Sequence, residues 1–215
     1  MSTLISRADA DAVEARIAAV EAHTGVQVVT TIVGKSDAYP EIPWKAFGIG
    51  ISIAALAVGV IDVVRPSWTT SALVWVHLVA TLAVGASCAL LAMFVPSFGR
   101  WFLRDTRGLA EVRQHAQAHF LARELFATSG RTGLLVFVSV YEHCVVILPD
   151  VGLAQRVGGD AWDVAIARMT PLLRAGRSGA ALLEGLAAIE TLLGERGLRG
   201  GVDATNTFPD RPTEL

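Results

Sequence analysis

The chain contains little cysteine and no excess of charge of either sign. Its 215 residues include two cysteines, Cys88 and Cys144, which both stand in apolar segments. A disulfide framework is therefore not expected, and a reducing compartment is compatible with the sequence. The formal net charge is −2, and the basic residues form no stripe interleaved with aromatics, which argues against nucleic acid as a partner. The first 25 residues lack the apolar core of a secretory signal peptide.

Charge is nearly missing from one long segment. Between Lys45 and Arg100 only two residues are charged, although the whole chain has 18% charged and 53% hydrophobic residues. Two apolar runs, 46–64 and 72–95, fill this segment. The first run would measure about 28 Å as an α-helix, close to the hydrocarbon thickness of a bilayer. Tryptophans flank the runs as in the aromatic belts of membrane proteins, at Trp44, Trp68, Trp75 and Trp101. We therefore expect two transmembrane helices rather than a hairpin buried in a soluble core.

Basic residues predict how this hairpin is oriented. The short connection between the runs contains only Arg65, whereas the outer ends are flanked by Lys35, Lys45, Arg100, Arg104 and Arg107. Basic residues favour the cytoplasmic side of a membrane. We therefore expect a protein of the bacterial inner (cytoplasmic) membrane, with two spans and both termini in the cytoplasm.

Two features of the apolar runs allow more than one interpretation. Small residues repeat at four-residue spacing, for example Gly50 with Ala54 and Thr81 with Gly85. They either let the two helices approach closely or reflect the abundance of small residues in membrane helices. His77 lies a turn or two from the connection, which favours an interfacial histidine over a functional group inside the membrane.

The polar parts of the chain carry helix and strand patterns on both sides of the hairpin. A helix is expected from Ser6, a cap candidate, to Gly25, and a strand of β-branched residues follows at 26–33. Later segments predict a helix at 109–130, strands at 134–140 and about 144–148, and two more helices. Because a lone strand cannot satisfy its backbone groups, the first strand should pair with the later two.

This pairing predicts one α/β domain that is interrupted by the membrane hairpin. The expected boundaries are 1–43 for the first part of the domain, 44–100 for the hairpin, 101–197 for the second part and 198–215 for a polar tail. The tail has no hydrophobic period and is expected to be extended or disordered.

Several segments, taken in order, resemble the TPM domain family, and most of all its bacterial membrane-anchored branch. They are "AHTGVQVV", "SDAYPEIPWKA", "GRTGLLVFVSVYEHCVVILPDVGL", the helix residue Trp162 and "NTFPDRPTEL". The resemblance implies an α/β/α sandwich around a small central sheet. Some soluble members are linked to acid phosphatase activity and divalent ions, and others act in photosystem repair or as auxiliary subunits. Many soluble members have Asp before the Gly that starts the second strand, whereas this chain reads Arg131-Thr132-Gly133, which weakens the transfer of metal binding.

Three carboxylates are candidate ligands for a divalent cation. Asp150 follows the last predicted strand, and Asp160 and Asp163 stand at the start of the next helix. Hard oxygen ligands of this kind suit calcium or magnesium. Glu142 lies at the other end of the strand, over about 20 Å away, and cannot join them. The same residues also suit structural roles, which we favour: Asp150 in an Asp-x-Gly turn, Asp160 as a helix cap and Asp163 at a helix dipole.

Other reactive residue types give weaker patterns. Glu111, His115 and His119 share one helix face, but without a third histidine or a catalytic Glu nearby we interpret this face as solvated. Ser139 lies inside an apolar strand without a nucleophile motif. Cys144 is interpreted as a buried strand cysteine rather than a thiolate nucleophile.

The sequence thus predicts a membrane-anchored TPM-like domain protein. Its expected role is that of a non-catalytic scaffold or accessory protein, whose partners are the lipid bilayer and a membrane protein complex. The alternative is a divalent-metal-dependent phosphatase with Asp150, Asp160 and Asp163 as ligands, so enzymatic activity stays undecided at this point.

Overall fold

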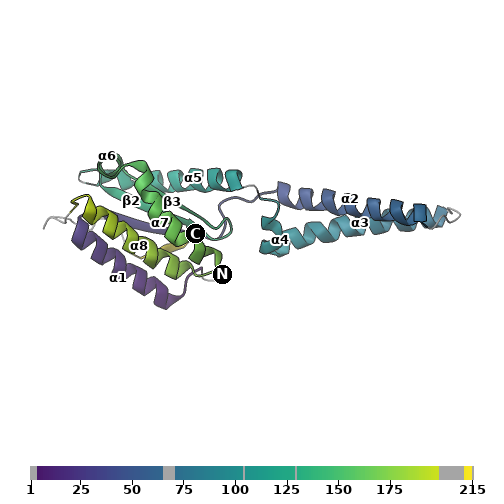
Figure 1. The fold of residues 1–215 in the computed structure, drawn as a ribbon, viewed down its shortest axis with the longest axis horizontal. Helices are drawn as coiled ribbons and strands as arrows, with labels where there is room; N and C mark the ends of the chain where they lie inside the picture. The colour runs from purple at the N-terminus through teal and green to yellow at the C-terminus, as the bar shows by residue number, and fades with distance from the viewer. Residues whose placement is uncertain (1–3, 65–70, 104, 129, 199–210, 215) are drawn as a thin grey trace. The chain divides into compact units, whose positions relative to one another are not determined.

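The computed structural model describes residues 4–64, 71–103, 105–128, 130–198 and 211–214. The chain forms two compact units (Figure 1). One unit consists of Met1–Asp37 with Gly108–Leu215, and the other is Ala38–Arg107. These boundaries lie within seven residues of the expected 43/44 and 100/101.

The first unit is built around a small mixed sheet. Its strands, in the order β3-β2-β1-β4, are β1 (Gln27–Val33), β2 (Gly133–Ser139), β3 (Cys144–Pro149) and β4 (Thr213–Glu214). β1 pairs with β2 in parallel, with Val29 opposite Leu135, and β2 pairs with β3 antiparallel. The expected pairing of the first strand is therefore confirmed for β2, whereas β3 joins the sheet through β2 and does not contact β1 as a neighbour. Parallel neighbours need a crossover connection, and in this chain the crossover contains the whole second unit.

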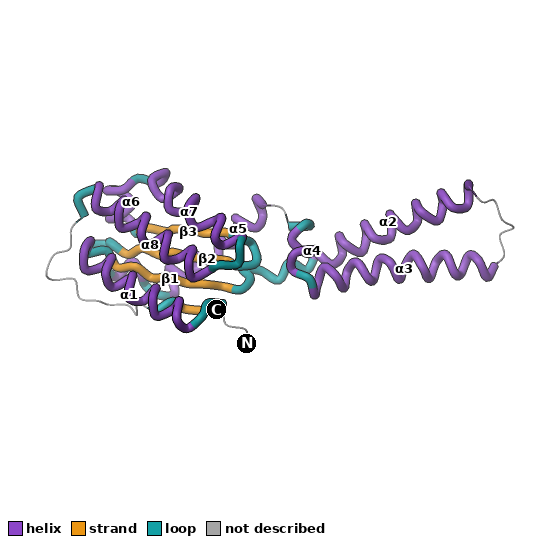
Figure 2. The backbone as a smooth tube through the Cα atoms, turned by 60° about the horizontal axis from the view of Figure 1, so that its bottom comes forward, coloured by secondary structure: helices purple, strands orange, loops and turns teal. Residues whose placement is uncertain are grey.

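One face of the sheet is covered by three helices. They are α1 (Arg7–Thr24), α7 (Asp163–Arg174) and α8 (Ser178–Glu195) (Figure 2). Alternate strand residues such as Val28, Ile32 and Leu134 enter one core cluster with these helices. Apolar residues of α8 that recur at three- and four-residue spacing are fully buried in this cluster, namely Leu182, Leu186, Ile189 and Leu193.

The other face is covered by the helix that follows the hairpin, α5 (Asp105–Ala122), and by the short 3-10 turn η1 (Leu125–Ala127). Its cluster takes the intervening strand residues, including Val29 and Phe137, with Val112 and Ala116 of α5. Every residue of β1 and β2 is consequently buried, as expected for strands covered on both faces. Leu109, near the start of α5, is half exposed.

The first helix begins and ends where the sequence predicts. Ser6 is its N-cap and accepts a hydrogen bond from the Asp9 N–H at 3.1 Å. Gly25 ends it in the left-handed conformation, with φ 70°, which costs glycine little because it has no Cβ.

The last residues of the chain correct the prediction for the tail. Much of the segment expected to be extended or disordered lies outside the described residues, but Thr213 and Glu214 form β4, parallel to Thr31 and Ile32 of β1. Side chains hold this strand: Arg211 reaches Asp11 at 3.3 Å. The strand was not predicted because two residues show no periodicity and their partner is distant in sequence.

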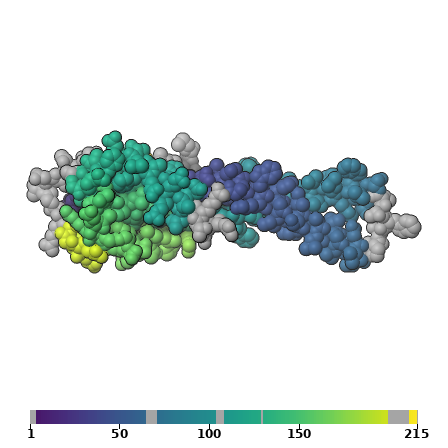
Figure 3. Space-filling view, turned by 90° about the horizontal axis from the view of Figure 1, so that it is seen from above, coloured from purple at the N-terminus to yellow at the C-terminus, as the bar shows by residue number. Residues whose placement is uncertain are grey.

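The second unit is a helical hairpin with a short third helix. α2 (Glu41–Val64) and α3 (Ser71–Phe94) have 24 residues each, and α4 (Pro96–Arg100) follows. Both long helices are long and apolar enough to cross a membrane. Only 11% of the most apolar window of each helix is buried. In the space-filling view their side chains, in blue, form the surface of this unit along its length (Figure 3).

Glycines let the two helices of the hairpin approach closely. A Cβ on Gly85 would lie 2.7 Å from Cγ1 of Ile51, and one on Gly50 would lie 3.0 Å from the Gly85 Cα. The first distance is shorter than real Cβ contacts and the second is tighter than nearly all of them, so both positions favour glycine. The close-packing interpretation of the small residues is thus confirmed at Gly50 and Gly85.

Candidate functional site

The predicted ligand Asp150 lies between the end of β3 and the start of α6 (Val151–Val157). Its side chain is 3% exposed and accepts the Val151 N–H at 2.7 Å, so it is the N-cap of α6. Arg131 donates to both carboxylate oxygens, from Nε to Oδ2 at 2.7 Å and from Nη2 to Oδ1 at 3.0 Å. This hydrogen bond raises the pKa of the Arg131 guanidinium. Bidentate pairs of this kind are among the strongest side-chain hydrogen bonds.

The backbone around Arg131 and Asp150 explains why two nearby residues, Gly133 and Gly152, are glycines. A Cβ on Gly152 would lie 2.4 Å from the Gly130 carbonyl oxygen, and one on Gly133 would lie 2.3 Å from that of Leu125. Side chains would therefore collide with the backbone at both positions. Arg131 itself has φ 55°, in the left-handed region that few side chains adopt. The segments around "RTG" and "PDVG" consequently meet as a packed junction between two loops.

The other two predicted ligands lie apart from this junction on the surface. Asp160 stands in the 3-10 turn η2 (Gly159–Trp162), and its carbonyl accepts the N–H of Asp163. Asp163 starts α7, where its charge favours the helix dipole. Both side chains are exposed. The described residues contain no group of three His, Cys, Asp or Glu side chains that could hold a metal ion, so the three carboxylates are not brought together. The structural role expected of Asp163 is observed, whereas Asp150 caps α6 instead of forming the expected Asp-x-Gly turn, and Asp160 caps no α-helix.

A polar cluster that the sequence did not indicate lies at the carboxyl ends of β1 and β2. Ser139, fully buried, donates to Glu142 Oε2 and accepts from Ser36 Oγ at 3.0 Å. The Ser36 N–H donates to Glu142 Oε1 at 3.0 Å. Ser139 therefore uses its hydroxyl to tie the β2–β3 turn to the loop after β1. Only the parallel register, which places Val33 opposite Ser139, could have revealed this cluster.

The two histidines of α5 correct the expectation of a solvated face. The rings of His115 and His119 lie 5.5 and 6.2 Å from the ring of Phe137 on β2. His119 Nε2 is buried and has no hydrogen-bond partner among the described residues. Burial lowers the pKa of His119, and the positive charge of Arg123 lowers it further. On α5 these half-buried rings lie beside Val112 and Ala116 and extend the apolar cluster of this face. The sequence pattern alone did not show this.

The cysteine of β3 is a poor nucleophile. Burial raises the pKa of Cys144 to about 11, and the charge of Glu142 adds to this shift. At neutral pH the thiol is protonated, and the thiolate is the reactive form.

One histidine and one aspartate of the hairpin lie close to each other. His77 Nδ1 of α3 lies 4.0 Å from Asp62 Oδ2 of α2. His77 therefore faces the acidic residue near the end of the other helix.

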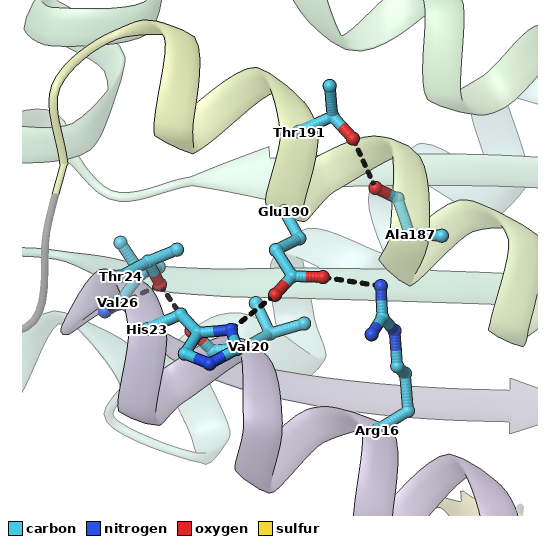
Figure 4. A network of polar contacts seen from close by, with 8 residues as sticks. All are labelled: Arg16, Val20, His23, Thr24, Val26, Ala187, Glu190 and Thr191. Carbon is cyan, nitrogen blue, oxygen red and sulfur yellow. Dashed lines mark hydrogen bonds and ion pairs between the residues drawn. The ribbon is translucent and has the colours of Figure 1, made fainter.

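A second polar network fastens α1 to α8 on the domain surface (Figure 4). Glu190 of α8 accepts from Arg16 and lies 2.6 Å from His23 Nδ1. His23 is largely exposed, with 70% of its side chain accessible. The network joins two neighbouring helices, so we assign it a structural role.

Comparisons with known proteins give a fold but no family. No protein-family model matches the chain, and no curated protein matches its sequence. A solved structure, the NMR structure of the BA42 protein from the psychrophilic bacterium Bizionia argentinensis, is similar to it with a TM-score of 0.59. The match covers 100% of this chain and 98% of that protein at 12% identity. At this identity the likeness shows a shared fold and nothing about activity.

Proposed function

We propose that this protein is a bacterial inner-membrane protein whose hairpin anchors a TPM-like domain, an α/β/α sandwich, at the cytoplasmic face. In this proposal the domain is a non-catalytic accessory protein that binds a partner in a membrane complex. The alternative is a divalent-metal-dependent phosphatase, and no cluster of carboxylates among the described residues favours it.

The observation that carries the proposal is the exposure of apolar side chains on the hairpin. Many large apolar residues along both helices are more than half exposed, for example Leu56 at 70%, Val63 at 80% and Val79 at 61%. A core helix of a soluble protein would bury such side chains, and apolar patches of this extent mark interaction surfaces or membranes. A bilayer covers the whole circumference of two helices of this length.

The topology of the chain supports, independently of its charges, that both outer ends of the hairpin lie on the same side of the membrane. The hairpin lies between β1 and β2, which are hydrogen-bonded neighbours in one sheet. Two spans return the chain to the side from which it left, so one folded sheet requires both outer ends of the hairpin on that side. The basic residues at those ends favour the cytoplasm.

The engagement of the reactive groups supports a non-catalytic role. Arg131 neutralises the charge of Asp150, Ser139 is buried in hydrogen bonds, and Cys144 carries a protonated thiol. Many soluble TPM members have Asp just before this Gly, whereas this chain reads Arg131-Thr132-Gly133, and the guanidinium of Arg131 supplies the positive charge that a metal ion would provide beside Asp150.

Thiol labelling in spheroplasts tests the anchor and its orientation. In a chain without native cysteines, Ser67→Cys places a thiol in the connection between the spans, and Gln155→Cys places a matched one on the exposed surface of α6. We expect a membrane-impermeant maleimide to label the first variant in intact spheroplasts and the second only after lysis. Labelling of Gln155→Cys in intact spheroplasts would reverse the orientation, and recovery of both variants in the soluble fraction would refute the anchor.

A further inference from the structure

Aromatic rings gather at the end of the hairpin where α2 begins and α3 ends. α4 and the two residues after it contribute Phe98, Trp101 and Phe102, with ring centroids 6.2 Å apart for Phe98 and Trp101 and 5.4 Å apart for Phe98 and Phe102. On α2, Trp44 meets Phe47 edge-on at 6.1 Å. We call these five residues the aromatic collar.

The two tryptophans of the collar are unusually open. Trp101 is 85% exposed and Trp44 is 74% exposed. Water-facing indole rings of this size are costly, because most of their area is apolar. Trp and Tyr are enriched at membrane interfaces, where the ring reaches the acyl region and the N–H reaches the headgroups.

The sequence around α4 changes from apolar to basic, as expected where a chain leaves the membrane. Pro96 starts a new helix directly after the apolar α3, whose last residues Met93 and Phe94 are 62% and 74% exposed. From Pro96 to Arg107 the sequence has three arginines and one acidic residue. The collar thus continues the apolar surface of the hairpin and is followed by positive charge, which complements phosphate groups.

We propose that the aromatic collar binds the headgroup layer of a phospholipid bilayer, with α4 lying in the interface rather than in the span or in water. The proposal rests on the membrane anchor of the preceding section and adds the depth and the chemical partner of these rings. It fixes where the hairpin stops in the bilayer, because the collar resists both deeper insertion and withdrawal.

Fluorescence quenching by brominated phospholipids measures this depth. The full-length protein is reconstituted in vesicles with bromine either near the headgroup end of the acyl chains or near the chain ends. One variant keeps Trp101 and the buried Trp162, with the other tryptophans replaced by Phe. A matched variant replaces Trp101 as well and carries Leu82→Trp, in the middle of α3 on a side that is 45% exposed. A chain with Trp162 alone gives the background.

We expect shallow bromine to quench Trp101 at least twofold more strongly than deep bromine, and the reverse order for Leu82→Trp. Deep quenching of Leu82→Trp with no quenching of Trp101 would leave the anchor standing and overturn the inference, since the collar would then face water or a protein. Preferential deep quenching of Trp101 would overturn it as well. Shallow quenching of Trp101 without quenching of Leu82→Trp would support the collar and refute the anchor, and no quenching of either would refute both.

Discussion

Asp150 combines two interactions that substitution can separate. Its carboxylate caps α6 and pairs with the guanidinium of Arg131. Asn is as good an N-cap as Asp, whereas Ala has no acceptor. The two variants therefore distinguish the cap from the charge pair.

We expect Asp150→Asn to lower the urea midpoint of the domain, because the ion pair with Arg131 is lost. Asp150→Ala should be less stable than Asp150→Asn by about 1 kcal/mol, the usual value of an N-cap. Urea unfolding of the detergent-solubilised protein, followed by the fluorescence of Trp162, measures both. Equal stability of the two variants would show that the cap contributes nothing.

The same variants test the predicted metal ligands. A cation that binds only the folded protein must raise the midpoint. If Asp150, Asp160 and Asp163 hold calcium or magnesium, millimolar amounts of the ion raise the midpoint of the wild-type protein and not that of Asp150→Asn. Because Arg131 already pairs with Asp150, we expect no ion-dependent difference between the two proteins.

His119 makes the stability of the domain depend on pH. Burial lowers its pKa below the ordinary value of 6.5, so the unfolded chain binds a proton more readily than the folded one. The stabilisation is complete above pH 6.5 and is lost as the pH falls from there toward the lower pKa of the folded state. We expect the midpoint to decline as the pH falls below 6.5, and the decline to be smaller in His119→Phe, which keeps a ring against Phe137. Equal slopes in the two proteins would assign the decline to other groups.

At the scale of elements, the contact between α2 and α3 depends on glycine at the crossing point. Leu at Gly85 would overlap Ile51 and Phe47, whereas a Cβ on Gly59 of α2 meets no atom within 4 Å. The two positions therefore form a matched pair, since both lie in long apolar helices and gain the same side chain.

We expect Gly85→Leu to destabilise the hairpin by about 1–3 kcal/mol, the usual cost of overpacking. Gly59→Leu should leave it nearly unchanged. Titration with sodium dodecyl sulfate, followed by the fluorescence of Trp75, compares them. Similar losses in both variants would show that any bulky residue harms the hairpin and that close packing at Gly85 is not the cause.

The sequence patterns predicted where helices and strands lie in the chain better than they predicted which elements contact one another. β1, β2 and β3 were predicted within a residue or two of their ends, because β-branched runs between glycines are local signals. The prediction that the face of α5 with His115 and His119 is solvated was wrong, because a histidine suits either a solvated or a half-buried face. β4 was missed because its partner β1 is about 180 positions away, and because the preceding Arg211 pairs with Asp11 and Glu14, which are about 200 positions away.

For the whole molecule, the division into two units predicts that the α/β unit folds without the hairpin. Its two core clusters contain only residues of Met1–Asp37 and Gly108–Leu215. A chain in which Ala38–Arg107 is replaced by a flexible Gly/Ser linker should be soluble without detergent and unfold cooperatively in urea. Aggregation, or a broad transition, would show that the hairpin contributes to the fold of the domain as well as to its location.

The sequence by itself determined the features that arise from local pattern and composition. The two apolar helices, the cap of α1, the three longer strands and the buried stripe of α8 all follow from the spacing of apolar residues and from cap chemistry. The tertiary structure alone decided which groups distant in sequence meet: Ser36 with Ser139 and Glu142, and the C-terminal strand with β1. It also separated Asp160 and Asp163 from Asp150. Such contacts depend on the register and packing of segments that the hairpin separates in sequence, and no local pattern encodes the register between strands more than 100 residues apart.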